Sequence, residues 1–70
     1  MNASEITAQV MRDAGFISSA SEEGVTVALT NRVVSRSEVL TVIEREELPI
    51  DGENVIGCFG GVLIELADYS

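Results

Sequence analysis

Two helix-start signatures constrain how this 70-residue chain can fold. In the first, Asn2 is followed three positions later by Glu5. In the second, Ser35 stands in the same relation to Glu38. Such a pair forms a capping box, in which each side chain satisfies a free backbone N–H group at the start of a helix. We therefore predict one helix near the N-terminus and a second that begins near Arg36.

The first predicted helix has one apolar side. Ile6, Val10 and Ala14 recur at helical spacing, with Met11 beside them. The polar residues of the opposite side are Glu5, Gln9, Arg12 and Asp13. This pattern predicts that Ile6 and Val10 face the core. Gly15 follows at the position where a left-handed residue ends a helix.

The second predicted helix is bounded at both ends. Val34 and Val39 occupy the two positions of a hydrophobic staple around the Ser35 cap. Pro49 requires the helix to end by about Leu48. Its predicted apolar arc consists of Val39, Leu40, Val42 and Ile43.

Each predicted helix is followed by two β-type segments. Residues 25–29 alternate between apolar and small polar side chains, and the weaker segment 16–20 can pair with them through a turn at 21–24. Segments 55–59 and 62–66 are joined by a Gly-Gly pair, which suits a tight hairpin. The order is therefore helix, hairpin, helix, hairpin.

That order predicts a single α+β domain spanning residues 1–70, because no internal repeat or long linker divides the sequence. We expect a small two-layer sandwich, with both helices on one face of a 3-4 stranded antiparallel sheet. A split β-α-β arrangement without its first strand is one version of it. The predicted core residues are Ile6, Val10, Val27, Leu29, Val39, Ile43, Val62 and Ile64.

The composition argues against several classes of function. Twelve Asp or Glu residues face four Lys or Arg, for a net charge of −8, and the chain contains no His. All four basic residues are Arg, so neither His nor Lys can activate a nucleophile. The excess of negative charge opposes contact with a phosphate backbone. We expect no enzymatic activity, no cofactor and no direct binding of nucleic acid.

The same sequence predicts a cytoplasmic protein. No basic region followed by an apolar run comes after Met1, as a secretory signal would require. The uncharged stretch 55–64 is too short to span a membrane. Cys58 is the single cysteine and lies in an apolar run, which predicts a reduced, buried thiol.

Two short motifs invite a ligand-binding interpretation that their surroundings do not support. The run Asp-Gly-Glu-Asn at 51–54 resembles part of a calcium loop but lacks the alternating oxygen ligands and the closing Glu. The glycine-rich run 57–61 lacks the following helix start or basic residue that a phosphate site needs. We predict no metal site and interpret the glycines as a hairpin turn.

Residues 38–54, with the run Glu-Arg-Glu-Glu-Leu-Pro-Ile-Asp at 44–51, resemble the second helix and following loop of acyl carrier proteins. Chain length and acidity are similar to that family too. However, the family carries its phosphopantetheine serine in an Asp-Ser-Leu motif, and residues 36–38 here read Arg-Ser-Glu. The β-type segments also conflict with an all-helical bundle. We do not assign the chain to that family.

The end of the second predicted helix is unusually acidic. We define the acidic cluster as Glu44, Glu46, Glu47, Asp51 and Glu53. Its three glutamates are expected in the last helical turn, where the helix dipole disfavours negative charge by about 0.3–1 kcal/mol per residue. Local rules are broken preferentially at functional surfaces. A patch that only confers solubility is the alternative interpretation.

Two functional hypotheses follow. In the first, the protein is a small acidic protein-binding module whose acidic cluster docks on the basic groove of a nucleic-acid-binding protein. Small viral or mobile-element inhibitors of the anti-CRISPR or DNA-mimic kind are analogous in size and charge. In the second, the apolar C-terminal hairpin pairs with a second copy, which makes a homodimeric structural or adaptor domain.

Overall fold

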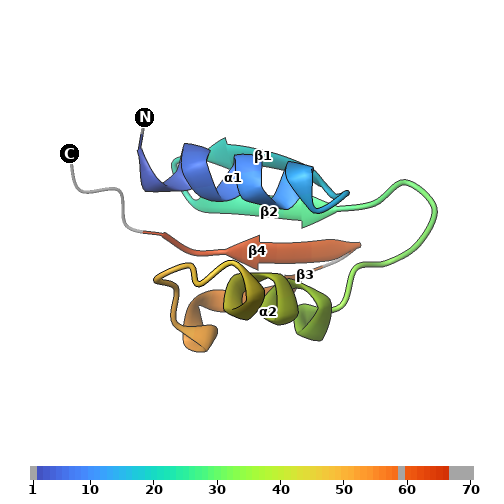
Figure 1. Ribbon diagram of the computed structural model, residues 1–70. Coiled ribbons are helices and arrows are strands. Elements are labelled where there is room, and N and C mark those ends of the chain that lie inside the picture. The colour runs from blue at the N-terminus through green and yellow to red at the C-terminus, as the bar shows by residue number, and fades with distance from the viewer. Residues whose placement is uncertain (1, 59, 67–70) are drawn as a thin grey trace.

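The chain forms an α+β domain of two helices and a four-stranded antiparallel sheet (Figure 1). The computed structural model describes residues 2–58 and 60–66. In chain order its elements are α1 (Ala3–Asp13), β1 (Ile17–Ser21), β2 (Gly24–Ala28), α2 (Arg36–Arg45), the 3-10 helix η1 (Gly52–Asn54), β3 (Val55–Cys58) and β4 (Gly61–Ile64). The predicted α+β class is confirmed.

Both helices begin where the capping signatures predict. The Asn2 side chain accepts a hydrogen bond of 2.9 Å from the backbone N–H of Glu5. The Ser35 side chain accepts from the backbone N–H of Glu38, and the Glu38 carboxylate accepts from the backbone N–H of Ser35 at 2.8 Å, which completes a capping box. Local hydrogen bonding therefore sets both starts.

Both helices also end in the same way. The backbone N–H of Phe16 donates to the carbonyl of Met11 at 3.1 Å, and that of Leu48 donates to the carbonyl of Ile43 at 3.0 Å. Each is the long hydrogen bond of a Schellman motif, which requires a left-handed residue between helix and loop. That residue is Gly15 in α1, as predicted, and Glu47 in α2.

The four strands are arranged in the order β1-β2-β4-β3, so each hairpin supplies one central and one edge strand. All three pairings are antiparallel. Val27 lies opposite Ser18 on β1 and opposite Val62 on β4. Because side chains opposite one another share a face, the buried residues of the strands all point to one side of the sheet. Those residues are Ser18, Val25, Val27, Val55, Val62 and Ile64.

The helices cover that face side by side (Figure 1). Helix α1 packs on β1 and β2, and α2 packs on β3 and β4. The core between the layers consists of Ala8, Met11, Val25, Val27, Val34, Val39, Val42, Ile43, Val55, Val62 and Ile64. Both members of the hydrophobic staple, Val34 and Val39, belong to it.

The predicted orientation of α1 is wrong in part: Met11 is buried as expected, but Ile6 is not. Ile6 is 46% exposed, and Val10 is only partly buried. The buried side of α1 is instead formed by Ser4, Thr7, Ala8 and Met11. Ser4, Thr7 and Ala8 are small, so the helix backbone can approach the sheet closely along this side. The bulkier side chain of Ile6 then lies between α1 and the segment that follows α2.

Two further core predictions need correction. Leu29 is partly buried and lies at the margin of the core, because β2 ends at Ala28. Cys58 is exposed rather than buried. It lies on β3 in register with Gly61 and Ala28, on the sheet face that the helices do not cover. The neighbouring residue Phe59, part of a predicted strand, lies outside the described residues.

The fold repeats one unit, although the sequence shows no evident repeat. Each half is a helix followed by a two-strand hairpin, and the strands Gly24–Ala28 and Gly61–Ile64 pair at the centre of the sheet. A Cβ atom added at Gly24 would collide with the carbonyl oxygen of Ile64. One added at Gly61 would collide with that of Val27. Glycine is therefore required at corresponding places in both halves.

Candidate protein-binding surface

All members of the acidic cluster are exposed to solvent. Glu44 lies in the last turn of α2, which ends at Arg45, so the expectation of three glutamates within that turn is wrong. Glu46 is the C-cap residue, and Glu47 has left-handed backbone torsion with φ 53°. The cluster therefore extends from the helix end through the loop to η1.

Few positive charges neutralise this cluster. Arg45 pairs with Glu46 at 3.2 Å, and both side chains are exposed. The guanidinium group of Arg36 instead donates to the backbone carbonyls of Val55 at 2.7 Å and Gly52 at 2.6 Å, which fastens η1 to the start of α2. Within residues 2–58 and 60–66, the remaining cluster members form no ion pair: Glu44, Glu47, Asp51 and Glu53.

An apolar groove lies beside the acidic cluster, between α1 and the segment that follows α2. This inter-helix groove has a volume of about 250 Å³. Ile6 on α1 lines one wall, and Leu48 and Ile50 line the other. The full lining consists of Ala3, Ile6, Thr7, Leu48, Pro49, Ile50 and Leu66. Ile6, which is predicted to be a core residue, thus forms part of a groove wall.

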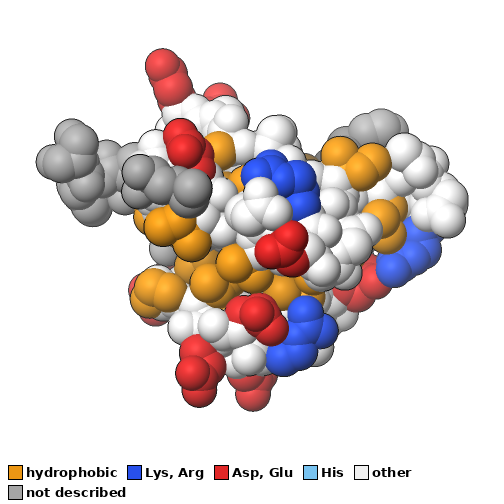
Figure 2. Space-filling model, turned by 45° about the horizontal axis from the view of Figure 1, so that its top comes forward, with side chains coloured by type: hydrophobic (Ala, Val, Ile, Leu, Met, Phe, Trp, Pro, Cys, Tyr) orange, Lys and Arg blue, Asp and Glu red, His pale blue; other side chains and the backbone are white. Residues whose placement is uncertain are grey.

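A second, smaller hollow of about 130 Å³ lies toward the end of α1. Val10 and Ala14 are its apolar lining residues. Asp13 of α1 and Glu46 of the acidic cluster line the same hollow, together with Arg45. Figure 2 shows apolar side chains gathered between the two helices with acidic side chains along the margins. Apolar surface and negative charge thus occur together.

Chain connectivity explains this juxtaposition. The groove wall at 48–50 is flanked directly by Glu47 and Asp51. The left-handed backbone at Glu47 turns the chain out of α2, and Pro49 prevents the helix from continuing. The same short loop therefore presents apolar side chains to the groove and carboxylates to solvent.

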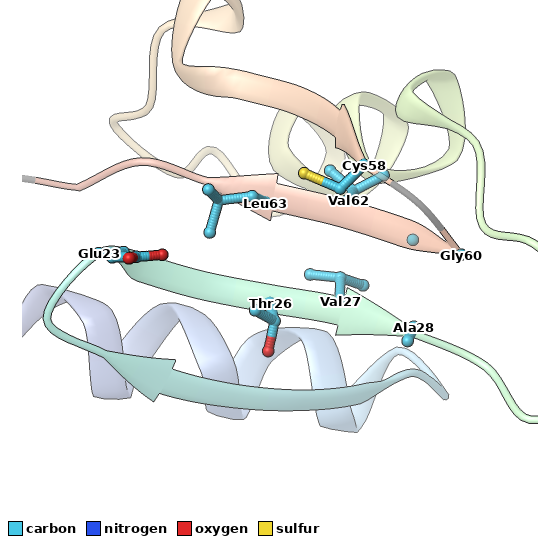
Figure 3. A pocket seen from close by; sticks show the side chains of 9 residues that line it. Glu23, Thr26, Val27, Ala28, Cys58, Gly60, Val62 and Leu63 are labelled. Carbon is cyan, nitrogen blue, oxygen red and sulfur yellow. The ribbon is translucent and has the colours of Figure 1, made fainter.

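A second exposed surface is the sheet face opposite the helices. Ile17 is 55% exposed and Ile56 is 38% exposed on this face. Figure 3 views it and shows Thr26, Cys58 and Leu63 around a shallow hollow over the central strands. Strand β3 forms one edge of the sheet, as the homodimer hypothesis requires of one hairpin strand.

One carboxylate with a strongly shifted pKa belongs to the fold rather than to these surfaces. Arg32 donates a hydrogen bond of 2.8 Å to Glu38, and the backbone N–H of Ser35 donates to the same carboxylate. These contacts lower the pKa of Glu38 from 4.5 to about 2. Its ionised form completes the capping box of α2, so this charge stabilises the helix start.

Metal binding and membrane crossing find little support among the described residues. In the described part of the chain, no group of three or more Cys, Asp or Glu side chains is arranged to hold a metal ion. Neither described helix has the length and apolar character that crossing a membrane requires. Comparisons of the chain with protein-family models, with curated proteins and with solved structures find no match.

The sequence indicates the acidic cluster but not the inter-helix groove. Helical spacing predicts that Ile6 and Val10 belong to the core and that Asp13 lies on a solvated helix side. The signal that could have corrected this is the row of small residues on the adjacent side of α1, Ser4, Thr7 and Ala8, which favours close helix packing.

Proposed function

We propose that this protein is a small acidic protein-binding module that docks on a basic surface of another protein. The observation that carries the proposal is the exposed acidic cluster, four of whose members have no ion-pair partner among the described residues. Unpaired surface carboxylates speed association with a basic partner by electrostatic attraction, and no ion pair within the protein has to break when they bind it. A cytoplasmic protein that itself binds nucleic acid is the partner class that best fits, and inhibition by phosphate mimicry is the proposed action.

The test compares two variants of equal net charge. The first carries Glu44→Gln, Glu47→Gln and Asp51→Asn in the acidic cluster. The second carries Glu22→Gln, Glu23→Gln and Glu65→Gln, three exposed carboxylates outside it. Affinity capture from native host extract, followed by mass spectrometry, first identifies the partner. Its affinity for each variant is then measured across a salt series.

We expect the cluster variant to bind about tenfold or more weakly, with a reduced salt dependence, and the control to bind nearly as the unmodified protein does. Both variants should remain folded, and relief of the conflict with the helix dipole should leave the first at least as stable. Equal binding by the two variants would show that only net charge matters, and the acidic cluster would then be a solubility patch.

The second candidate function is a homodimeric structural or adaptor domain. A specific observation favours it: β3 is an edge strand with Ile56 and Cys58 exposed, and this lysine-free chain lacks the usual charged protection of such an edge. Pairing of two copies along β3 would cover it. Light scattering across an about hundredfold dilution tests this idea, and a constant monomer mass would remove it.

A further inference from the structure

We propose that the inter-helix groove holds an apolar side chain from a basic, amphipathic segment of the partner protein. This inference rests on the proposed function, because it states how a partner with a basic surface is bound. The proposed occupant is a peptide segment in which a large apolar residue is flanked by Arg or Lys. The apolar lining of the groove, the acidic residues near it and the exposure of Ile6 support this occupant.

The apolar character of the groove requires an explanation. Ile6 is 46% exposed although α1 has enough small residues to bury one side completely. Leu48, Pro49 and Ile50 face it across the groove, and Leu66 contributes from the end of the β4 hairpin. Three segments distant in sequence thus bring apolar side chains to one concave surface. An anchor side chain that fills such a pocket is typical of the centre of a protein interface.

The negative charge near the groove favours basic residues beside the apolar anchor of the bound peptide. Glu47 and Asp51 flank the groove wall in sequence, and Asp13 and Glu46 line the smaller hollow farther along α1. Within the described residues, the basic side chain lining this hollow is Arg45, which already pairs with Glu46. A neutral or acidic ligand would desolvate these carboxylates without compensation, whereas Arg or Lys beside the anchor would pair with them.

The experiment pans a random-peptide display library against the folded protein. We expect enriched peptides to combine an aromatic or large aliphatic residue with neighbouring Arg or Lys. Their dissociation constants are then measured on Ile6→Gln and on the matched control Ile17→Gln, which replaces an exposed isoleucine on the opposite sheet face. Ile6→Gln should weaken binding about tenfold, and Ile17→Gln should leave it unchanged. Circular dichroism verifies that both variants are folded.

The remaining outcomes separate this inference from the proposed function. Purely basic peptides that lose affinity for the Glu44, Glu47 and Asp51 variant, but not for Ile6→Gln, would leave acidic docking intact and overturn the groove's role. Enriched peptides without basic residues, or no enrichment, would overturn the stated ligand chemistry. In ¹⁵N NMR spectra without peptide, shifts of the Ile6 and Ile50 amides on dilution would assign the groove to a second copy and overturn the proposal.

Discussion

The two helix-hairpin halves of the molecule share their boundaries but differ in one connection. Each begins with a capped helix and ends with a hairpin whose second strand starts at a glycine, Gly24 or Gly61. In the first half, Phe16 alone separates the left-handed Gly15 from β1. In the second, residues 48–54 separate the left-handed Glu47 from β3.

That longer connection provides part of the candidate functional surface. It contains the groove wall at 48–50 and the acids Asp51 and Glu53, and it is held in place by Arg36. The first half contributes the opposite wall through Ile6. The candidate surface thus lies partly on a loop outside the paired strands that maintain the fold.

The halves also differ in how they fill the core, and this leads to the largest predicted effect. Helix α2 buries Val39, Val42 and Ile43, whereas α1 buries mainly small residues. Ile43→Ala should lower the free energy of unfolding by about 2–5 kcal/mol, because it leaves a cavity under α2. Ala8→Gly, at the buried side of α1, should lower it by about 1 kcal/mol through helix propensity. Chemical denaturation of both variants measures the difference, and equal losses would contradict it.

The next prediction concerns the glycines at the centre of the sheet. Gly61→Ala should destabilise the protein by about 1–3 kcal/mol, because the new methyl group meets the Val27 carbonyl across the β2-β4 pairing. Gly57→Ala is the control on the adjacent strand β3, where an added Cβ meets nothing within 4 Å. Thermal melts should show a large shift for the first variant and almost none for the second. A similar shift for both would mean that the strands separate easily.

Exchanging the helix-ending residues tests whether the halves differ in backbone strain. A non-glycine residue in the left-handed region costs about 1–2 kcal/mol. Glu47→Gly should therefore stabilise the protein by about 1 kcal/mol, and Gly15→Ala should destabilise it by a similar amount. Glu47→Gln separates the charge from the backbone effect. If the Gln variant gained as much stability as the Gly variant, repulsion in the acidic cluster rather than backbone strain would be responsible.

The smallest predicted effect depends on pH and on the second capping box. The folded state lowers the pKa of Glu38 from 4.5 to about 2, because Arg32 and the Ser35 N–H group bind its ionised form. A lowered pKa stabilises the fold above the unfolded-state value, and this contribution is lost as pH falls through the folded-state value. The unmodified protein should thus have a higher melting temperature than Glu38→Gln at pH 7. This difference in melting temperature should disappear as the pH falls from 4.5 to about 2. A difference independent of pH would contradict this role.

Local sequence determined the boundaries of the structure. Capping by Asn2 and Ser35 operates within three residues, and the left-handed Gly15 and the two-residue turn between β1 and β2 are equally local. Such interactions do not depend on where distant segments lie. The helix starts, the helix-hairpin order and the α+β class could therefore be predicted. The exposure of the acidic cluster follows equally from charge, since unpaired carboxylates are rarely buried.

Tertiary structure alone decided which sides of the elements meet. Periodicity shows that Ile6 and Ala8 lie on different sides of α1, but only the closeness of helix and sheet selects Ala8 for the core. The pairing of β2 with β4 likewise exposes Cys58 and places β3 at the edge. The inter-helix groove needs three distant segments at once. No local pattern predicts this groove, because it forms only where α1 lies close to the segment that follows α2.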